Sequence, residues 1–184
     1  METIKPNVCI FHGTGGTPDL FWIPYLKTEL EKLGYEVWAP QMPEAEEPDV
    51  NVWVPYVFNN KKFNSETILI GHSAGATLIL SLLEKADTPI KKAILVSGFY
   101  QYDKPFPILQ ESYNWEKIKN NCKQFVFMNS DDDPYQCGDV QGRGMFDKLG
   151  GIQIILHGQG HMGSNKYNQP YKEFPLLLKL CEEF

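Results

Sequence analysis

A serine set between two glycines is the residue of this chain whose surroundings best suit chemistry. Residues 67–79 read TILIGHSAGATLI, and Gly71-His72-Ser73-Ala74-Gly75 stands where strand-forming residues give way to helix-forming ones. Glycines on both sides let the backbone turn sharply, so the serine hydroxyl would project above a sheet. The start of the helix adds partial positive charge, and the Ala74 N–H could bind an oxyanion. The pattern predicts a nucleophilic Ser73, with a plain glycine turn as the alternative.

A serine hydroxyl needs a neighbouring base, and the chain offers a histidine and several acids further along. Ser130-Asp131-Asp132-Asp133-Pro134-Tyr135 follows one apolar run, and Gly158-Gln159-Gly160-His161-Met162 follows the next. An acidic run is more often a solvated turn, and a glycine-flanked histidine is often only a loop residue. The order serine, aspartate, histidine at successive strand ends is nevertheless the order of α/β hydrolases. We therefore expect Ser73 and His161 to act together, with one of the aspartates orienting the imidazole.

A glycine-rich stretch, FHGTGGTP at residues 11–18, follows the first apolar run. Phosphate binding is disfavoured, because no Gly-Lys-Ser/Thr follows and Pro18 occupies the last glycine position of a dinucleotide-binding pattern. Beside a nucleophilic serine, such a loop offers the second oxyanion donor, which we expect to be the N–H of Thr14 or Gly13. Structural roles are expected for the other three histidines: His12, His72 and His157.

Six short apolar runs place these motifs in a fold. Several are apolar at consecutive positions rather than alternating, which is typical of parallel strands covered by helices on both faces. Segments of helical spacing separate them, and this alternation predicts an open, doubly wound α/β sheet. Loops and helix amino termini converge at the carboxyl ends of such strands, where the motifs lie. The expected strands are 7–13, 35–40, 67–72, 92–99, 124–130 and 152–158, and the expected helices are 19–34, 73–87, 140–150 and 171–184.

Two stretches interrupt this alternation, at residues 40–60 and 99–118. The first is rich in proline and acidic residues and the second in aromatic and polar ones, so we expect loops with short helices over the top of the sheet. Their aromatic side chains could line an apolar acyl pocket. The candidates for substrate binding are Phe99, Tyr100 and Trp53, and a place in the core is the alternative for each of them.

The composition limits the class of protein. The chain has 184 residues with 42% hydrophobic content, which suits one domain spanning residues 1–184. A formal net charge of −6 without a basic stripe argues against nucleic-acid binding. No signal pattern or membrane-length apolar stretch is found, so we expect a cytoplasmic protein without membrane association. No cofactor or metal is expected either, because the cysteines lack zinc or disulfide spacing: Cys9, Cys122, Cys137 and Cys181.

Taken together, these motifs resemble the retinoblastoma-binding protein 9 family of small serine hydrolases, a branch of the α/β-hydrolase superfamily. The resemblance rests on residues 12–16 and 71–75, on Asp132-Asp133-Pro134-Tyr135, on Gly160-His161 and on EFPLLLKL at 173–180. It implies a three-layer α/β-hydrolase fold with a mostly or fully parallel six-stranded sheet and no substantial lid domain. It also implies Ser73 as nucleophile, His161 as base and Asp133 as the orienting acid, since the family's acid directly precedes a proline and an aromatic residue.

The expected reaction is esterase-like cleavage of a small or extended acyl ester, thioester or amide by a Ser-His-Asp triad. The alternative is a protein-binding module on a hydrolase scaffold whose triad is idle. The expected partner is a small acyl substrate. A retinoblastoma-type pocket protein is not expected, because Lys179 occupies the leucine position of the Leu-x-Cys-x-Glu motif in Lys179-Leu180-Cys181-Glu182-Glu183.

Overall fold

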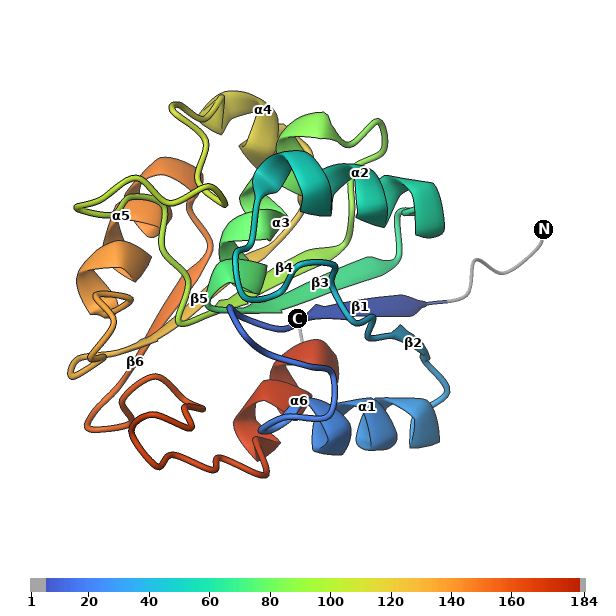
Figure 1. Ribbon diagram of the computed structural model, residues 1–184. Helices are drawn as coiled ribbons and strands as arrows, with labels where there is room; N and C mark the ends of the chain where they lie inside the picture. The colour runs from blue at the N-terminus through green and yellow to red at the C-terminus, as the bar shows by residue number, and fades with distance from the viewer. Residues whose placement is uncertain (1–5, 183–184) are drawn as a thin grey trace.

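A parallel sheet forms the centre of the molecule (Figure 1). The computed structural model describes residues 6–182. In this part of the chain, six strands pair in parallel in the order β2-β1-β3-β4-β5-β6, which confirms the expected fold class. Glu183 of the pocket-protein motif lies outside the described residues. The strands are β1 (Asn7–Phe11), β2 (Glu36–Trp38), β3 (Thr67–His72), β4 (Lys92–Val96), β5 (Phe125–Ser130) and β6 (Ile152–Leu156).

Helices cover both faces of the sheet and give three layers. In Figure 1, α1 and α6 lie together below the sheet, and α2, α3 and α4 lie above it. Side chains of α5 join the same apolar cluster as those of α2 and α3. None of the helices in the described residues is both long and apolar enough to cross a membrane. The helices are α1 (Ile23–Lys32), α2 (Val50–Asn60), α3 (Ala74–Lys85), α4 (Trp115–Asn120), α5 (Asp139–Leu149) and α6 (Pro175–Glu182).

Two apolar cores lie between the layers, because successive side chains of a strand point to opposite faces. In β3, Ile68 and Ile70 belong to the core beneath α1 and α6, whereas Leu69 belongs to the core on the other face. Strands β1, β3, β4 and β5 are buried at every position, which explains their continuous apolar runs. The edge strands β2 and β6 are only partly buried.

The proline-rich stretch at 40–60 contains a longer helix than the sequence suggested. Helix α2 has 11 residues, and the carboxylate of Asp49 caps it by accepting the Asn51 N–H at 2.7 Å. Pro55 lies inside α2, where it removes the N–H that would bind the Asn51 carbonyl. Asn51 is exposed, so water can bind that carbonyl instead. The helix is held from the other side, where Trp53 and Val57 are buried.

Candidate active site

Ser73 lies on a strained turn between β3 and α3. Its φ of 55° and ψ of −120° form a conformation that residues with a side chain rarely adopt. The Ser73 N–H donates to the Val96 carbonyl at 2.9 Å, and the Ser73 carbonyl accepts the N–H groups of Ala76 and Thr77. These bonds hold the serine from both sides, and so offset a backbone strain that costs about 1–3 kcal/mol.

Gly71 and Gly75 allow the strand and the helix to approach this closely. A Cβ at Gly71 would collide with the backbone of Gly75 and Ala76. A Cβ at Gly75 would collide with the carbonyl oxygens of Phe11 and His12. Any side chain at either position would push α3 away from the sheet, so both glycines of the pattern are sterically required.

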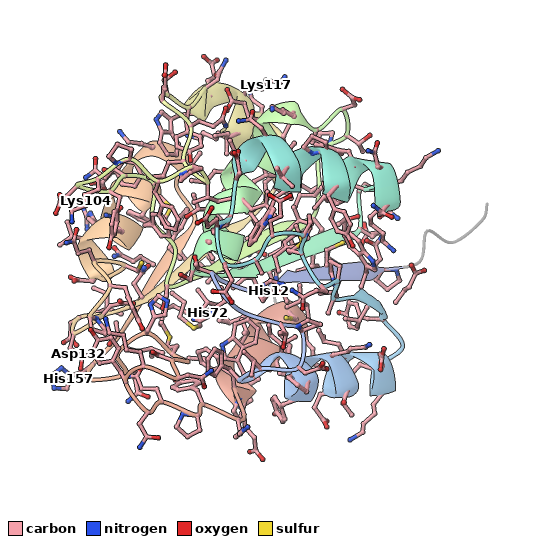
Figure 2. All side chains as sticks on the ribbon, in the orientation of Figure 1. His12, His72, Lys104, Lys117, Asp132 and His157 are labelled. Carbon is pink, nitrogen blue, oxygen red and sulfur yellow. The ribbon has the colours of Figure 1, made fainter. Side chains whose placement is uncertain are left out.

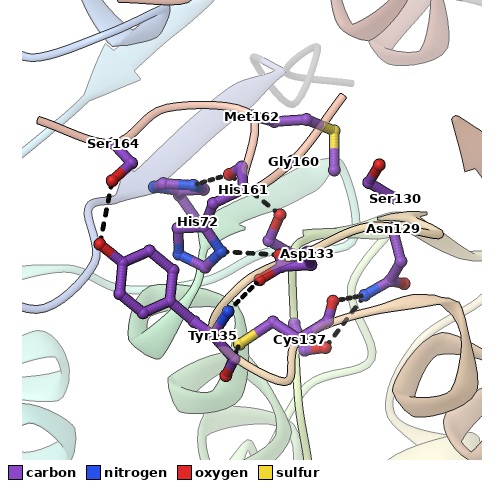
Figure 3. A network of polar contacts seen from close by, with 12 residues as sticks. His72, Asn129, Ser130, Asp133, Tyr135, Cys137, Gly160, His161, Met162 and Ser164 are labelled. Atoms are coloured by element: carbon purple, nitrogen blue, oxygen red, sulfur yellow. Dashed lines mark hydrogen bonds and ion pairs between the residues drawn. The ribbon is translucent and has the colours of Figure 1, made fainter. Parts of the chain in front are cut away.

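Asp133 and His161 form a buried pair after the ends of β5 and β6 (Figure 3). His161 Nδ1–H donates to Asp133 Oδ2 at 2.7 Å, and the two side chains are 7% and 0% exposed. The other carboxylate oxygen, Oδ1, accepts the Tyr135 N–H at 2.8 Å. Because a carboxylate only accepts, the proton of a neutral His161 lies on Nδ1 and leaves Nε2 free to act as a base.

The carbonyl oxygen of His161 links the loop that carries His161, called the histidine loop (residues 158–162), to the turn at Ser73, called the serine turn (Figure 3). His72 Nε2–H donates to it at 2.8 Å, and Ser97 Oγ–H donates at 3.1 Å. Burial lowers the pKa of His72 to about 3, and the neighbouring His161 acts in the same direction. His72 is therefore a neutral donor, so it supports the loop without adding charge to the site.

The glycine-rich loop lies directly against Ser73. A Cβ at Gly13 would lie 2.9 Å from the Ser73 Cβ and 3.5 Å from its Oγ. The Gly16 N–H donates to the Gly13 carbonyl at 3.1 Å, and Gly15 has a φ of 62°, as in a type II turn with Thr14 at its second position. Within residues 6–182, the N–H groups of Gly13 and Thr14 have no hydrogen-bond acceptor. Both are therefore available to an oxyanion.

His12 holds this loop in place. Its Nδ1–H donates to the Gly13 carbonyl at 2.9 Å, and its Nε2 accepts the Met42 N–H at 3.0 Å. Burial lowers the pKa of His12, which favours the neutral ring that has one donor and one acceptor. In a trans peptide the N–H and the preceding C=O point in opposite directions, so the Thr14 N–H points away from His12.

A cavity of about 580 Å³ opens beside Ser73 and His161, and both residues line it. Phe99, one of the predicted substrate-binding residues, also lines it, stacked on Phe106 with ring centroids 5.7 Å apart. Tyr135 forms another part of the wall. The cavity thus joins an apolar surface to the hydroxyl and imidazole groups.

Trp53 and Tyr100, which were also predicted to bind substrate, do not line this cavity. Trp53 is buried in the core, where its Nε1–H donates to the Pro43 carbonyl at 2.7 Å. The ring of Tyr100 packs edge-on against Trp115, with centroids 5.6 Å apart. Both are core contacts, so the prediction of substrate binding is corrected for these two residues.

Several lining residues were not identified from the sequence. Tyr135 had a local signal, because it follows Asp133-Pro134, and its hydroxyl lies 2.9 Å from Ser164 Oγ. Lys166 lies over the Tyr135 ring at 5.9 Å from its centroid. Loops from distant parts of the chain bring other residues to the cavity, and no local pattern marks them: Phe21, Lys104, Asn165 and Lys166. Tyr102 and Phe106 also line it, and they belong to the aromatic residues of 99–118 that were expected to line a pocket.

The other members of the acidic run lie outside the cavity. Figure 2 shows His12 and His72 in the interior and Asp132 and His157 at the periphery of the molecule. The side chain of His157 is 95% exposed, and its Nδ1 lies 2.6 Å from Asp131 Oδ2. This contact raises the pKa of His157 and lowers that of Asp131. His157 is therefore a surface residue, separate from the serine and the cavity.

One group of potential metal ligands occurs in the described residues. The ligand atoms of Asp133, Cys137 and His161 lie within 4.8 Å of one another. Asp133 and His161 already bind each other, and burial raises the pKa of the Cys137 thiol well above its usual value. A neutral thiol is a poor metal ligand, so these contacts favour the hydrogen-bonded pair and we assign no metal here.

The fold and this site define the class of protein. A parallel sheet that carries a serine on the turn between a central strand and its following helix, with an acid and a histidine after later strands, is the arrangement of the α/β hydrolases. Within that class, the chain belongs to the serine hydrolase family, whose sequence profile matches residues 8–180.

Similar proteins match most of the chain. It is 24% identical over 165 residues to the serine hydrolase RBBP9 of Rattus norvegicus, which covers 86% of this chain and 87% of the rat protein. The crystal structure of the ydeN gene product of Bacillus subtilis is similar with a TM-score of 0.85 and 23% identity, over 97% of each chain. Est1E of Butyrivibrio proteoclasticus, with ferulic acid bound, has a TM-score of 0.69 and 14% identity, over 97% of this chain and 87% of its own. These structural similarities support the α/β-hydrolase fold.

Proposed function

We propose that this protein is an esterase-like hydrolase that cleaves an acyl ester, thioester or amide through an acyl-enzyme on Ser73. One observation carries the proposal: the buried Asp133–His161 pair, with its 2.7 Å hydrogen bond, reaches the same cavity as the strained Ser73. Membership of the serine hydrolase family supports it. The similarity in fold to Est1E, which binds ferulic acid, is consistent with an esterase-like reaction.

Each group of the site has a role in this reaction. Ser73 Oγ attacks the acyl carbonyl while His161 Nε2 takes its proton, and Asp133 keeps the imidazole in the required tautomer. The N–H of Ala74, together with that of Thr14 or Gly13, binds the oxyanion. His161 then gives its proton to the leaving group, which leaves the acyl group on Ser73 Oγ. A water molecule attacks this acyl carbonyl while His161 takes its proton, and His161 returns the proton to Ser73 Oγ as the acid is released. The reaction needs neither a metal ion nor a cofactor.

The cavity suggests a small or extended acyl substrate. Its volume of about 580 Å³ lies in the range of small-molecule sites, and the rings of Phe99 and Phe106 give it apolar walls.

The cell compartment is a further part of the proposal. Cys9, Cys122, Cys137 and Cys181 are buried free thiols, which suits a reducing environment such as the cytoplasm.

Labelling with a fluorophosphonate tests the proposed function directly. The reagent needs a serine activated by a base and an oxyanion hole, so it reports the assembled site without a known substrate. We expect Ser73 to be modified in the wild type, the label to be lost in Ser73→Ala and strongly reduced in His161→Ala. His157→Ala is the matched histidine control and should keep the label, because His157 is a surface residue.

Turnover of a graded series of p-nitrophenyl esters completes the test and ranks acyl lengths. A folded wild-type protein that remains unlabelled and turns over no ester would reject the hydrolase proposal. That result would favour a binding module on a hydrolase scaffold.

A further inference from the structure

The loop that carries His161 is held by side chains rather than by regular backbone pairing. Its backbone has a positive φ at Gly158 (67°), Gly160 (55°) and Met162 (50°), which prevents the segment from continuing strand β6. Four consecutive N–H groups instead donate to side-chain oxygens. The bonds are Gly158 to Asp131 Oδ1 (2.9 Å), Gln159 to Ser130 Oγ (2.9 Å), Gly160 to Asp132 Oδ1 (2.7 Å) and His161 to Gln169 Oε1 (3.0 Å).

The pairing of β5 with β6 explains why the acidic run meets this loop. Ser130 pairs with Leu156 in the parallel sheet, so the residues that follow the two strands lie side by side. Asp132 Oδ1 also lies 2.6 Å from Ser130 Oγ. These contacts with Ser130 and with the Gly160 N–H lower the pKa of Asp132 and favour its ionised form. A carboxylate that accepts an N–H makes a stronger bond than a neutral acceptor does.

Gln169 reaches the loop from another direction. An antiparallel bridge fixes its backbone, because the Ser164 N–H donates to the Gln169 carbonyl at 3.0 Å and the Gln169 N–H donates to the Ser164 carbonyl at 2.7 Å. The side chain of Gln169 packs on Gly160 so closely that a Cβ at Gly160 would collide with it. Asp132 and Gln169 thus bind two successive N–H groups, those of Gly160 and His161.

We propose that Asp132 and Gln169 are positioning residues for His161. By fixing the peptide groups on each side of the Gly160 Cα, they hold the imidazole where it meets Asp133 and the cavity. Neither residue lines the cavity, so neither is placed to bind substrate. This inference rests on the proposed role of His161 as the base. It implies that loss of either acceptor lowers kcat and leaves KM unchanged.

Steady-state kinetics of paired substitutions test the inference. Asp132→Ala and Gln169→Ala remove the acceptors, and we expect each to lower kcat about tenfold with KM unchanged. Asp132→Asn and Gln169→Glu retain an acceptor oxygen, and each should restore kcat to within about threefold of the wild type. A residue that serves only overall stability would not show this recovery in protein that is already folded.

Asp131→Ala is the matched control. It removes the same charge from the same acidic run, but it releases only the Gly158 N–H and the exposed His157. We therefore expect kcat close to that of the wild type. If either alanine variant fails to fold, the other still tests the inference, because the two residues come from different segments.

The Nδ1 proton of His161 gives a second measurement that does not need turnover. A proton shared between a buried imidazole and a carboxylate gives a downfield NMR resonance, which we expect to be lost or broadened in both alanine variants and kept in Asp132→Asn. Alanine variants that keep both this resonance and kcat would overturn the inference. Absence of ester turnover and of Ser73 labelling in the wild type would instead reject the proposed function, and the resonance would still decide whether Asp132 and Gln169 position His161.

Discussion

His72 and His161 lie 89 positions apart in the chain, yet His72 Nε2–H donates to the His161 carbonyl at 2.8 Å. Their rings are also in contact, with centroids 4.8 Å apart. Because His72 directly precedes Ser73, this bond links the turn that carries Ser73 to the loop that carries His161. A charged His72 would be repelled by the imidazolium that forms on His161 during the proposed reaction, so its low pKa serves the chemistry as well as the fold.

The first prediction concerns stability at low pH. The folded pKa of His72 is lowered to about 3, whereas the unfolded residue takes up a proton near its ordinary value of about 6.5. Neutral His72 therefore contributes fully to the free energy of unfolding above about pH 6.5. As the pH falls from there toward about 3, the free energy of unfolding decreases by up to about 1.4 kcal/mol per pH unit. Urea unfolding at about pH 7 and about pH 5 measures this loss. Between the two pH values, the free energy of unfolding should fall less for His72→Gln than for the wild type.

His157→Gln is the control for that experiment. Asp131 raises the pKa of His157, so its contribution is present at low pH and is lost as the pH rises through the raised value. Its removal therefore cannot reduce the loss of stability on acidification. Equal losses in the wild type and in His72→Gln would contradict the assignment of a neutral, buried His72.

The second prediction concerns the acid. Asp133→Asn keeps the size of the side chain but no longer fixes the proton of His161 on Nδ1, so we expect kcat to fall by about 10⁴. Asp131→Asn removes the same charge two residues earlier, at an exposed position, and should reduce kcat only mildly. Ester hydrolysis, with thermal melts to confirm folding, measures both. The opposite ranking would show that Asp133 is not the orienting acid.

The location of these residues could be predicted from the sequence because strand ends leave a local signal. Ser73 and Asp133 follow continuous apolar runs, and His161 follows a mainly apolar one. Parallel strands bring their carboxyl ends to one edge of the sheet. The chain order of the three residues added information that no single motif held. The layered core follows from the same apolar runs, since strands buried on both faces need helices on both faces.

Contacts made by loops could not be predicted in this way. Trp53 lies in a proline-rich stretch that forms helix α2. The sequence did not show that its ring faces the apolar core instead of the cavity. The role of Gln169 could not be predicted either, because a glutamine in a polar loop belongs to no periodic pattern. Its contact with the His161 N–H depends on how the 164–169 segment folds back on itself.

The third prediction concerns the glycines. A Cβ at Gly75 would collide with the carbonyl oxygens of Phe11 and His12, and backbone of a central strand cannot move aside cheaply. We expect Gly75→Ala to lower the free energy of unfolding by about 3 kcal/mol, the upper end of the usual cost of overpacking, and to abolish labelling of Ser73. Gly34→Ala is the control, since a Cβ there meets no atom within 4 Å and only its φ of 88° is strained.

Chemical denaturation distinguishes the cost of the collision at Gly75 from the cost of the backbone strain at Gly34. Gly34→Ala should lose about 1 kcal/mol of unfolding free energy and keep full labelling. A Gly75→Ala variant as stable and as reactive as Gly34→Ala would show that the strand and helix are not in the close contact described.

The fourth prediction decides which N–H of the glycine-rich loop binds the oxyanion. Thr14 is the second residue of a type II turn, a position that proline favours, and its N–H has no acceptor in the described residues. Thr14→Pro should therefore preserve the thermal stability while removing a single donor. If that donor binds the oxyanion, kcat falls by about 10²–10³, and Thr14→Ala, which keeps the N–H, stays near the wild type.

The comparison of melting temperature with kcat makes the outcome unambiguous. The Gly13 carbonyl is already bound by His12 and by the Gly16 N–H, which directs the Thr14 N–H to the opposite side of the peptide. We therefore expect the loss of kcat to occur in Thr14→Pro. Unchanged turnover in a stable Thr14→Pro variant would assign the donor to Gly13 instead, where an added Cβ would lie 2.9 Å from the Ser73 Cβ.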